Sequence, residues 1–509
     1  QGIEFDYGCV HAVGAIRDLG HEAIIINNNP ETVSTDFDTS DRLYFDPLTL
    51  ESVSEVLLRE RAHGILLQFG GQTAINLALP LAGNMPHLST MGLHLVMEGT
   101  SPDAVDEASD RERFETFAAR NGLRMPRGST ATTPEEVRRA VHEIGYPVLI
   151  RPSYVLGGRG MEILSTDKQL DAYMDEAYLA PDRPLLIDEY LGNAIELDVD
   201  AVCDGDEVLV GAIMEHLEEA GIHSGDSTCF IPPQNIAEHV LAEVEDWTKR
   251  IGIELGIRGC FNIQYAIRDE VLYVLEVNPR GSRTFPFVAK ATGVPLARIA
   301  ARLAIGDKLA DLDVPMPQTD AVCVKAPVFP FIKLRGLDPA PGPEMKSTGE
   351  VMGSHVRASA AYLKARLATE LPVPVEGGVY ITVKDGDKLA IIDEARRLQE
   401  MGFTLYATRG TSHVLRDVGG LDVQTCYRIA ERRSPDALDL MRQGKIHLII
   451  NTPRSTGGAV LDGNMMRRLA VELNIPFVTT MAGAHMEVEA IQEAMNGMPE
   501  PRLLEIGSL

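Results

Sequence analysis

The segment Glu276-Val-Asn-Pro-Arg280 carries a carboxylate, an amide and a guanidinium group within five residues. Residues i and i+2 of a strand point to the same side, so Glu276 and Asn278 would present two hard oxygen ligands together. Such oxygens suit Mg²⁺ that bridges nucleotide phosphates. Gln264, in the strand before, adds a third oxygen if it pairs opposite. The alternative is a solvated strand end with one surface ion pair.

Arginine side chains lie close to this segment and in a glycine-rich stretch. Arg280 and Arg283 can stabilise the charge on a transferred phosphoryl group. The stretch Arg151-Pro-Ser-Tyr-Val-Leu-Gly-Gly-Arg-Gly160 places two guanidinium groups around a loop whose glycines let backbone N–H groups approach phosphate oxygens. A plain surface turn is the alternative for this loop.

Other polar positions are weaker candidates when each is taken alone. Glu189 and Glu196 flank Leu191, so an acid could accept a hydrogen bond from a ribose or adenine group while Leu191 packs a base. Surface acids are more often only solvated. The loop Gly221-Ile-His-Ser-Gly-Asp-Ser227 holds one histidine, and a lone loop histidine is more often inert. Gly70-Gly-Gln-Thr73 lacks G-x-G-x-x-G spacing, so NAD binding is not predicted.

Hydroxyl and amide side chains also follow two strands near the carboxyl end. Thr408-Arg-Gly-Thr411 and Asn451-Thr452 each follow an apolar run, and Lys388 stands near a helix start. Together with backbone N–H groups they could hold a phosphate. Ordinary turn capping by Thr and Asn is the alternative.

Alternating strands and helices must position these groups. The first 110 residues alternate in the way that is typical of a parallel α/β sheet, whose ligands sit at the carboxyl ends of the strands. The two predicted strands that flank Arg268-Asp-Glu270 indicate a hairpin. The strands predicted along the chain are 23–27, 64–69, 147–150, 196–202, 208–214, 260–267, 271–277, 379–383, 403–407 and 447–450.

Helix ends are marked by capping residues. Thr133-Pro-Glu-Glu136 predicts a helix start with a capping box, and Gly145 predicts its end. A second helix is predicted over 11–19, before Gly20. Asp387 is predicted to cap a helix that ends at Gly402.

Composition bounds the class of protein. The 509 residues correspond to roughly three to four domains. The net charge of −27 argues against nucleic acid or an anionic membrane as the main partner. Six cysteines lack C-x-x-C spacing, so we expect no zinc or disulfide framework and a cytoplasmic location. No run of 18 apolar residues and no signal peptide is present, so no membrane span is expected.

Seven motifs in order resemble one family. They are Gln1-Gly-Ile-Glu-Phe-Asp-Tyr, Asn29-Pro-Glu-Thr-Val-Ser-Thr-Asp36, Gln68-Phe-Gly-Gly-Gln-Thr73, Arg151-Pro-Ser-Tyr-Val-Leu-Gly-Gly-Arg159, Met214-Glu-His216, Gly221 to Ser227, and Glu276-Val-Asn-Pro-Arg280. Together they resemble the carboxyl-terminal half of the carbamoyl-phosphate synthase large subunit, over essentially the whole chain. Gly281 and Phe285 depart mildly from the family pattern beside the site.

The resemblance implies an α/β fold in several parts. These are a pre-ATP-grasp Rossmann-like domain over 1–110, an ATP-grasp domain over 111–310, a Pro-rich connecting segment over 311–375 and a methylglyoxal-synthase-like regulatory domain over 376–509. We expect the first strand of the first domain to lie before Gln1, and we leave open whether the chain is a fragment or a separate subunit.

The resemblance also implies an activity. This half would phosphorylate carbamate with ATP and Mg²⁺ or Mn²⁺, giving carbamoyl phosphate for pyrimidine and arginine synthesis. The whole enzyme is a glutamine-hydrolysing ligase that forms C–N bonds. Its partners would be the amino-terminal half of the large subunit, in the same or a separate chain, and a glutaminase small subunit.

Matching positions imply residue roles. ATP contacts are implied at Arg151, Glu189, Leu191, Glu196, Gly221, Ile222, His223, Ser224, Gln264 and Glu276, and metal ligands at Gln264, Glu276 and Asn278. Arg280 and Arg283 would stabilise charge during transfer. A nucleotide effector site is implied at Lys388, Thr408, Thr411, Asn451 and Thr452, and an ornithine site at Glu218, Asp226 and Glu344.

Three other hypotheses compete with this one. A different ATP-grasp or biotin-type ligase would not share all seven motifs. A catalytically incomplete regulatory or assembly subunit would not need the intact set of Gln264, Glu276, Asn278 and Arg151. A true methylglyoxal synthase would need an acid as general base, and none follows the His447-Leu-Ile-Ile-Asn451 run.

Overall fold

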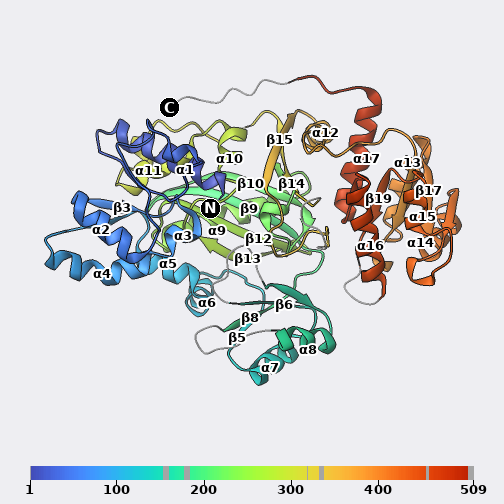
Figure 1. The fold of residues 1–509 in the computed structure, drawn as a ribbon, viewed down its shortest axis with the longest axis horizontal. Coiled ribbons are helices and arrows are strands. Elements are labelled where there is room, and N and C mark those ends of the chain that lie inside the picture. The colour runs from blue at the N-terminus through green and yellow to red at the C-terminus, as the bar shows by residue number, and fades with distance from the viewer. Residues whose placement is uncertain are drawn as a thin grey trace.

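The computed structural model (Figure 1) describes residues 2–152, 160–176, 184–317, 319–331, 338–453 and 458–501. A seven-stranded sheet occupies the middle of the molecule. The amino-terminal helices, in blue, lie on one side of it, and the carboxyl-terminal domain, in orange and red, lies on the other. A smaller four-stranded sheet lies below. Among the helices that the structure describes, none is long and apolar enough to cross a membrane.

The amino-terminal region contains two separate two-stranded parallel sheets. One pairs β1 (Ile24–Ile26) with β2 (Arg42–Tyr44), and the other pairs β3 (Gly64–Leu66) with β4 (Val96–Glu98). The helices are α1 (Ile3–Asp18), α2 (Leu50–Glu60), α3 (Gly71–Ile75), α4 (Ala78–Thr90) and α5 (Pro102–Ser109). Helix α1 begins eight residues before the predicted start at His11, because Phe5, Gly8, Ala12 and Ala15 form one buried face.

The four-stranded sheet is antiparallel, in the order β5-β8-β6-β7. Its strands are β5 (Gly128–Ala131), β6 (Val148–Pro152), β7 (Glu162–Leu164) and β8 (Leu185–Glu189), and its helices are α6 (Arg111–Arg120), α7 (Pro134–Ile144) and α8 (Asp167–Glu176). The predicted capping box is confirmed: Thr133 and Glu136 bond each other's backbone N–H groups, and Gly145 ends α7 with a φ of +87°.

The central sheet is antiparallel, in the order β13-β12-β9-β10-β11-β14-β15. Its strands are β9 (Ile195–Asp204), β10 (Val208–Glu219), β11 (Cys229–Ile231), β12 (Arg258–Arg268), β13 (Val271–Asn278), β14 (Val322–Val328) and β15 (Gly349–His355). Helix α9 (Glu238–Glu254) packs in one apolar core against the sheet. Helices α10 (Phe285–Thr292) and α11 (Leu296–Ala304) belong to a second core, together with α1.

The Pro-rich region 311–375 contributes directly to this sheet. We expected a connecting segment, but β14 and β15 from this region form its last two strands, and α12 (Ala358–Ala368) packs on them. The prolines misled the prediction because most of them lie outside the two strands; only Pro327 is inside one.

The carboxyl-terminal domain is a five-stranded parallel sheet in the order β18-β17-β16-β19-β20. Its elements are β16 (Gly378–Thr382), α13 (Ile391–Glu400), β17 (Thr404–Thr408), α14 (Arg409–Asp417), β18 (Val423–Cys426), α15 (Ala437–Arg442), β19 (Leu448–Asn451), α16 (Gly458–Glu472), β20 (Phe477–Val478) and α17 (Met481–Asn496). The prediction that Asp387 caps a helix is wrong, since Asp387 ends a separate 3₁₀ turn and Ala390 stands at the cap of α13.

Candidate functional site

The three predicted metal ligands lie together on the β12–β13 hairpin. Gln264 of β12 is paired directly with Glu276 of β13. Asn278, two residues further, donates a hydrogen bond from Nδ2 to Glu276 Oε1 at 2.8 Å. Its Oδ1 accepts one hydrogen bond and keeps a second lone pair for a cation. One carboxylate and two amide oxygens on one face fit a hard divalent cation.

The candidate site is built on amide oxygens and one carboxylate rather than on a cluster of acidic, His and Cys side chains. In the part of the chain that the structure describes, no group of three or more His, Cys, Asp or Glu side chains is placed to hold a metal ion. The candidate therefore depends on the amide oxygens of Gln264 and Asn278, as the sequence spacing indicated.

Two of the predicted arginines converge on these oxygens. The Arg280 NH2 group donates to Asn278 Oδ1 at 3.0 Å, and its Nε donates to Gln72 Oε1 at 2.9 Å. Arg151 NH1 lies 3.7 Å from Glu276 Oε2. Burial lowers the pKa of the Arg280 guanidinium. Two guanidinium groups thus border the candidate metal site, where a phosphate would need them.

Arg283 points to a different neighbour. Its NH1 donates to Glu4 Oε1 at 3.1 Å, and its guanidinium lies over the Phe5 ring at 5.6 Å. The structure therefore ties Arg283 to the first turn of α1. Glu4 was missed as a neighbour of the site, because 279 residues separate it from Arg283.

Arg151 also forms an ion pair with Asp188. Asp188 Oδ2 lies 3.6 Å from Arg151 Nε, and Asp188 Oδ1 lies 2.8 Å from an Arg111 nitrogen. Of the glycine-rich loop that follows Arg151, residues 153–159 lie outside the described residues. Gly160 is described, and its carbonyl accepts a hydrogen bond from the Tyr173 hydroxyl.

Glu196 is a buried acid that is bonded to the start of the predicted nucleotide loop. It is 3% exposed and accepts a hydrogen bond from the Gly221 N–H at 3.1 Å. Burial raises its pKa to about 7. His216 stands between Glu196, 3.9 Å away, and Asp198, 3.1 Å away. The acids 196, 198 and 200 alternate along β9, a period-2 pattern that places all three on one face of the strand.

The loop after β10 is shaped by Gly221. Its φ is +93°, and a Cβ there would lie 2.9 Å from the Tyr190 ring, so glycine is required. His223 follows after Ile222, and its Nδ1 accepts a hydrogen bond from the Gly225 N–H at 3.0 Å. Burial lowers the pKa of His223, with a smaller contribution from Arg283. Ser224 begins a 3₁₀ turn, and its carbonyl accepts from Lys325 at 3.2 Å.

Glu189 and Leu191 have structural partners of their own. Glu189 Oε2 accepts from Arg127 and Oε1 accepts from Arg268. Burial opposes ionisation of Glu189, but these two arginines outweigh it and lower its pKa. Leu191 is buried against Ala194, Ala220 and Ala266.

The three residues matched to an ornithine site differ in burial and in their hydrogen-bond partners. Asp226 is fully buried, and its carboxylate accepts the backbone N–H groups of Lys346 and Ser347, both at 2.8 Å. Glu218 accepts the Thr228 N–H, and burial raises its pKa to about 7. Glu344 is exposed.

The predicted effector residues gather at one edge of the five-stranded sheet. Strands β17 and β19 flank β16 in parallel, so Thr408 and Asn451 end at the same edge. Lys388 lies beside Gly410 and pairs with Asp385 at 2.7 Å. Thr411 and Thr452 are buried.

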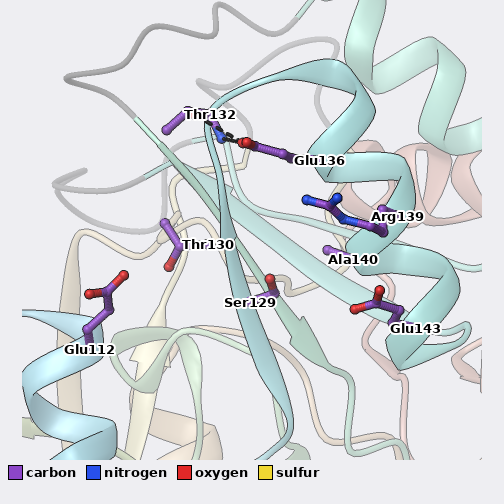
Figure 2. Close-up of a pocket in the computed structure, with 8 residues that line it drawn as sticks. All are labelled: Glu112, Ser129, Thr130, Thr132, Glu136, Arg139, Ala140 and Glu143. Atoms are coloured by element: carbon purple, nitrogen blue, oxygen red, sulfur yellow. Dashed lines mark hydrogen bonds between the residues drawn. The ribbon is translucent and has the colours of Figure 1, made fainter.

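A shallow recess lies away from all of these residues (Figure 2). It measures about 320 Å³ and lies between α7 and β5. Its lining residues are Glu112, Ser129, Thr130, Thr132, Glu136, Arg139, Ala140 and Glu143. Glu136 is already bonded to Thr132 and Thr133 as part of the capping box. The recess contains none of the predicted site residues.

Family models match three stretches of the chain. Residues 1–107 match the carbamoyl phosphate synthase preATP-grasp domain, and residues 110–312 match the carbamoyl-phosphate synthase L chain, ATP binding domain. Residues 390–479 match the MGS-like domain. These matches confirm the expected fold class.

Curated relatives match nearly the whole chain. The carbamoyl phosphate synthase large chain of Methanothrix thermoacetophila is 51% identical over 98% of this chain and 46% of the relative. The carbamoyl phosphate synthase large chain, C-terminal section, of Methanocaldococcus jannaschii is 48% identical over 98% of this chain and 81% of the relative. The chain thus spans about half the length of the full-length large chains it matches.

Solved structures share the fold at low identity. The biotin carboxylase domain of Hydrogenobacter thermophilus 2-oxoglutarate carboxylase, in complex with MgADP, has a TM-score of 0.57 at 19% identity, over 72% of this chain and 87% of that one. The ADP complex of an N5-carboxyaminoimidazole ribonucleotide synthetase has a TM-score of 0.56 at 14% identity, over 72% and 94%. The sequence relatives decide the family: the chain belongs to the carbamoyl phosphate synthase large-chain family and corresponds to its carboxyl-terminal section.

Proposed function

We propose that this chain transfers the γ-phosphoryl group of ATP to carbamate, giving carbamoyl phosphate and ADP. A carbamate oxygen forms the new P–O bond, and the bond to the β-phosphate oxygen breaks. The observation that carries the proposal is the cluster of Gln264, Glu276 and Asn278 oxygens bordered by Arg151 and Arg280. Its oxygen ligands and guanidinium groups are those that a phosphoryl transfer needs.

Each part of the cluster has a proposed role. Gln264, Glu276 and Asn278 would hold Mg²⁺ or Mn²⁺, which when bound neutralises phosphate charge. Arg280 faces the same oxygens and stabilises charge on the transferred group. Arg283, which is bonded to Glu4, is proposed to stabilise the same charge beside Arg280. No covalent enzyme intermediate is required.

The nucleotide is proposed to lie between the two antiparallel sheets. The residues proposed to contact it are Arg151, Glu189, Leu191, Glu196, Gly221, Ile222, His223, Ser224, Gln264 and Glu276. Glu196 anchors the loop by accepting the Gly221 N–H, and the lack of a Cβ at Gly221 leaves room for the Tyr190 ring. Because Glu189 is already paired with two arginines, we propose that it acts through a single lone pair or after a local rearrangement.

We further propose a place for this chain in a larger enzyme. The full-length curated relative is about twice as long, and another relative is itself a C-terminal section, which supports an amino-terminal half as partner, in the same or a separate chain. A glutaminase small subunit would supply ammonia, and the product would feed pyrimidine and arginine synthesis. Nucleotide and ornithine effectors are proposed at the carboxyl-terminal sheet edge and at Glu218, Asp226 and Glu344.

The direct test is the reverse reaction. Purified chain is incubated with ADP, carbamoyl phosphate and Mg²⁺, and ATP formation is measured with luciferase. ATP formation that depends on both substrates and on the metal supports the proposal, and its absence in a folded, ADP-binding preparation contradicts it.

A further inference from the structure

Gln68 lies between β3 and α3 and joins the amino-terminal region to the β12–β13 hairpin. Its side chain is 2% exposed, and its Nε2 donates to the carbonyl oxygens of Cys260 and Pro279, both at 3.1 Å. The same nitrogen lies 3.0 Å from Thr100 Oγ1, so its two N–H groups are shared among three oxygens. Because carbonyl oxygens only accept, the nitrogen of this amide and not its oxygen must face them.

The turn after β13 is held at two further points by the segment that begins at Gln68. The Gly281 N–H donates to the Gln68 carbonyl at 2.9 Å, and Arg280 Nε donates to Gln72 Oε1 at 2.9 Å. Pro279 directly follows a proposed metal ligand and directly precedes Arg280. The hydrogen bonds to Pro279 and Gly281 therefore fix the backbone on both sides of Arg280.

Two glycines leave room for the Gln68 amide. Gly99 has a φ of +88° and Gly259 a φ of +101°, and a Cβ at either position would overlap Gln68 Oε1. In the part of the chain that the structure describes, Oε1 has no hydrogen-bond partner. An unpaired buried acceptor lowers stability, so the favourable contacts of this amide are those of its nitrogen.

We propose that Gln68 is a positioning residue for the phosphoryl transfer, because it holds the 279–281 turn so that Arg280 faces the transferred group. The inference rests on the proposed function, and Gln68 acts through Arg280 rather than on the substrate. Without the bond to Pro279, the turn keeps its tie on the Gly281 side of Arg280 and loses the tie on the other side. A displaced guanidinium weakens stabilisation of the transition state more than it weakens nucleotide binding.

The alternative is that Gln68 only stabilises the contact between the two domains. Thr100→Val is the matched control for this alternative. Thr100 is 6% exposed, and its Oγ1 also bonds the backbone of Arg258. The valine variant thus removes buried hydrogen bonds at the same junction but leaves the bond from Gln68 to Pro279 in place.

The kinetic test measures ATP formation from ADP, carbamoyl phosphate and Mg²⁺. Gln68→Met is expected to lower kcat roughly tenfold, the size of one lost hydrogen bond, while the KM for ADP changes less than about threefold. Thr100→Val should keep the wild-type kcat. In an Arg280→Ala background, Gln68→Met should lower kcat less than about twofold, because an effect exerted through Arg280 is lost with it. Equal kcat values in Gln68→Met and Thr100→Val, or full additivity with Arg280→Ala, overturn the positioning role.

Hydrogen exchange without ligand separates this inference from the proposed function. Exchange at the Arg280 and Gly281 amides is expected to rise about tenfold in Gln68→Met and to stay at the wild-type rate in Thr100→Val. A wild-type chain that binds MgADP but forms no ATP contradicts the proposed function. Exchange then decides whether Gln68 holds the turn: a rise in Gln68→Met supports it, and an unchanged rate rejects it. Gln68→Asn, whose amide is set back by one methylene, repeats both measurements if Gln68→Met does not fold.

Discussion

Gln264 and Glu276 face each other directly across the β12–β13 hairpin, and the register shifts immediately after Gln264. The shift leaves Leu275 without an opposite residue, and the pairing is regular on both sides of it. The candidate metal site is thus built on two paired strands of the central sheet rather than on a loop. Strand positions hold ligands more firmly than loop positions do.

Replacing the carboxylate of the metal site should abolish metal-dependent turnover. In Glu276→Gln, the loss of the only charged ligand of the three is expected to lower ATP formation from ADP and carbamoyl phosphate by at least about a hundredfold. The measurement is the initial rate over a Mg²⁺ series.

The matched control for that variant is Glu270→Gln. Glu270 lies in the turn of the same hairpin with its side chain largely exposed. This variant should keep the wild-type rate. Equal rates for Glu276→Gln and the wild type would refute the ligand assignment.

Arg280 should matter more for the rate than for nucleotide binding. Arg280→Lys keeps one positive charge but cannot donate to Gln72 and Asn278 at once. We expect kcat to fall roughly a hundredfold while the KM for ADP changes less than about threefold. Steady-state kinetics separates the change in kcat from the change in the KM for ADP. A large rise in KM with normal kcat would place Arg280 in ground-state binding instead.

Asp200 predicts a pH dependence of stability. Its carboxylate is fully buried, accepts from Thr284 and Asn262, and has a pKa that burial raises to about 6. Between the ordinary pKa of an aspartate and this raised pKa, the folded state keeps Asp200 protonated, whereas the unfolded state has already lost that proton. The contribution of Asp200 to stability should decrease as the pH rises from about 4 to 6 and stay constant above that range, by about 3 kcal/mol in all.

Urea unfolding at several pH values measures this effect. Asp198, Ser282 and Asn262 face Asp200 and remain in the variant Asp200→Asn, which lacks the titrating group. Its stability should vary less over the same pH range. The same slope in both proteins would show that other groups cause the dependence.

The pair between α12 and α17 should be structurally important. Glu487 is fully buried and accepts two hydrogen bonds from Arg366 and one from the Tyr362 hydroxyl. Glu487→Gln leaves the Arg366 charge buried without its counter-ion, which should cost about 3–5 kcal/mol in thermal or urea unfolding. The double variant Arg366→Met, Glu487→Leu should recover most of that loss, and a neutral single variant would contradict this account.

Local patterns in the sequence predicted the elements that carry the site. The hairpin around Arg268 and the ligand spacing in 276–278 follow from the period-2 rule, which depends only on neighbouring residues. The capping box of Thr133 and Glu136 is local in the same way. Because these features need no distant contact, the structure reproduces them.

Contacts between distant segments could not be predicted from the same patterns. Glu4 and Arg283 meet because α1 packs on α11, and Arg467 meets Asp338 because two domains share an interface. The strands β14 and β15 were missed because prolines dominate their surroundings. The acids of β9 look like a solvated strand in the sequence, whereas the fold buries them.

The reverse reaction tests the central claim most directly. The wild-type chain, Glu276→Gln and Glu270→Gln are each given ADP, carbamoyl phosphate and Mg²⁺, and ATP is quantified after binding of MgADP has been verified by calorimetry. The account predicts ATP formation by the wild type and by Glu270→Gln, and almost none by Glu276→Gln. A wild-type chain that binds MgADP but forms no ATP would contradict it.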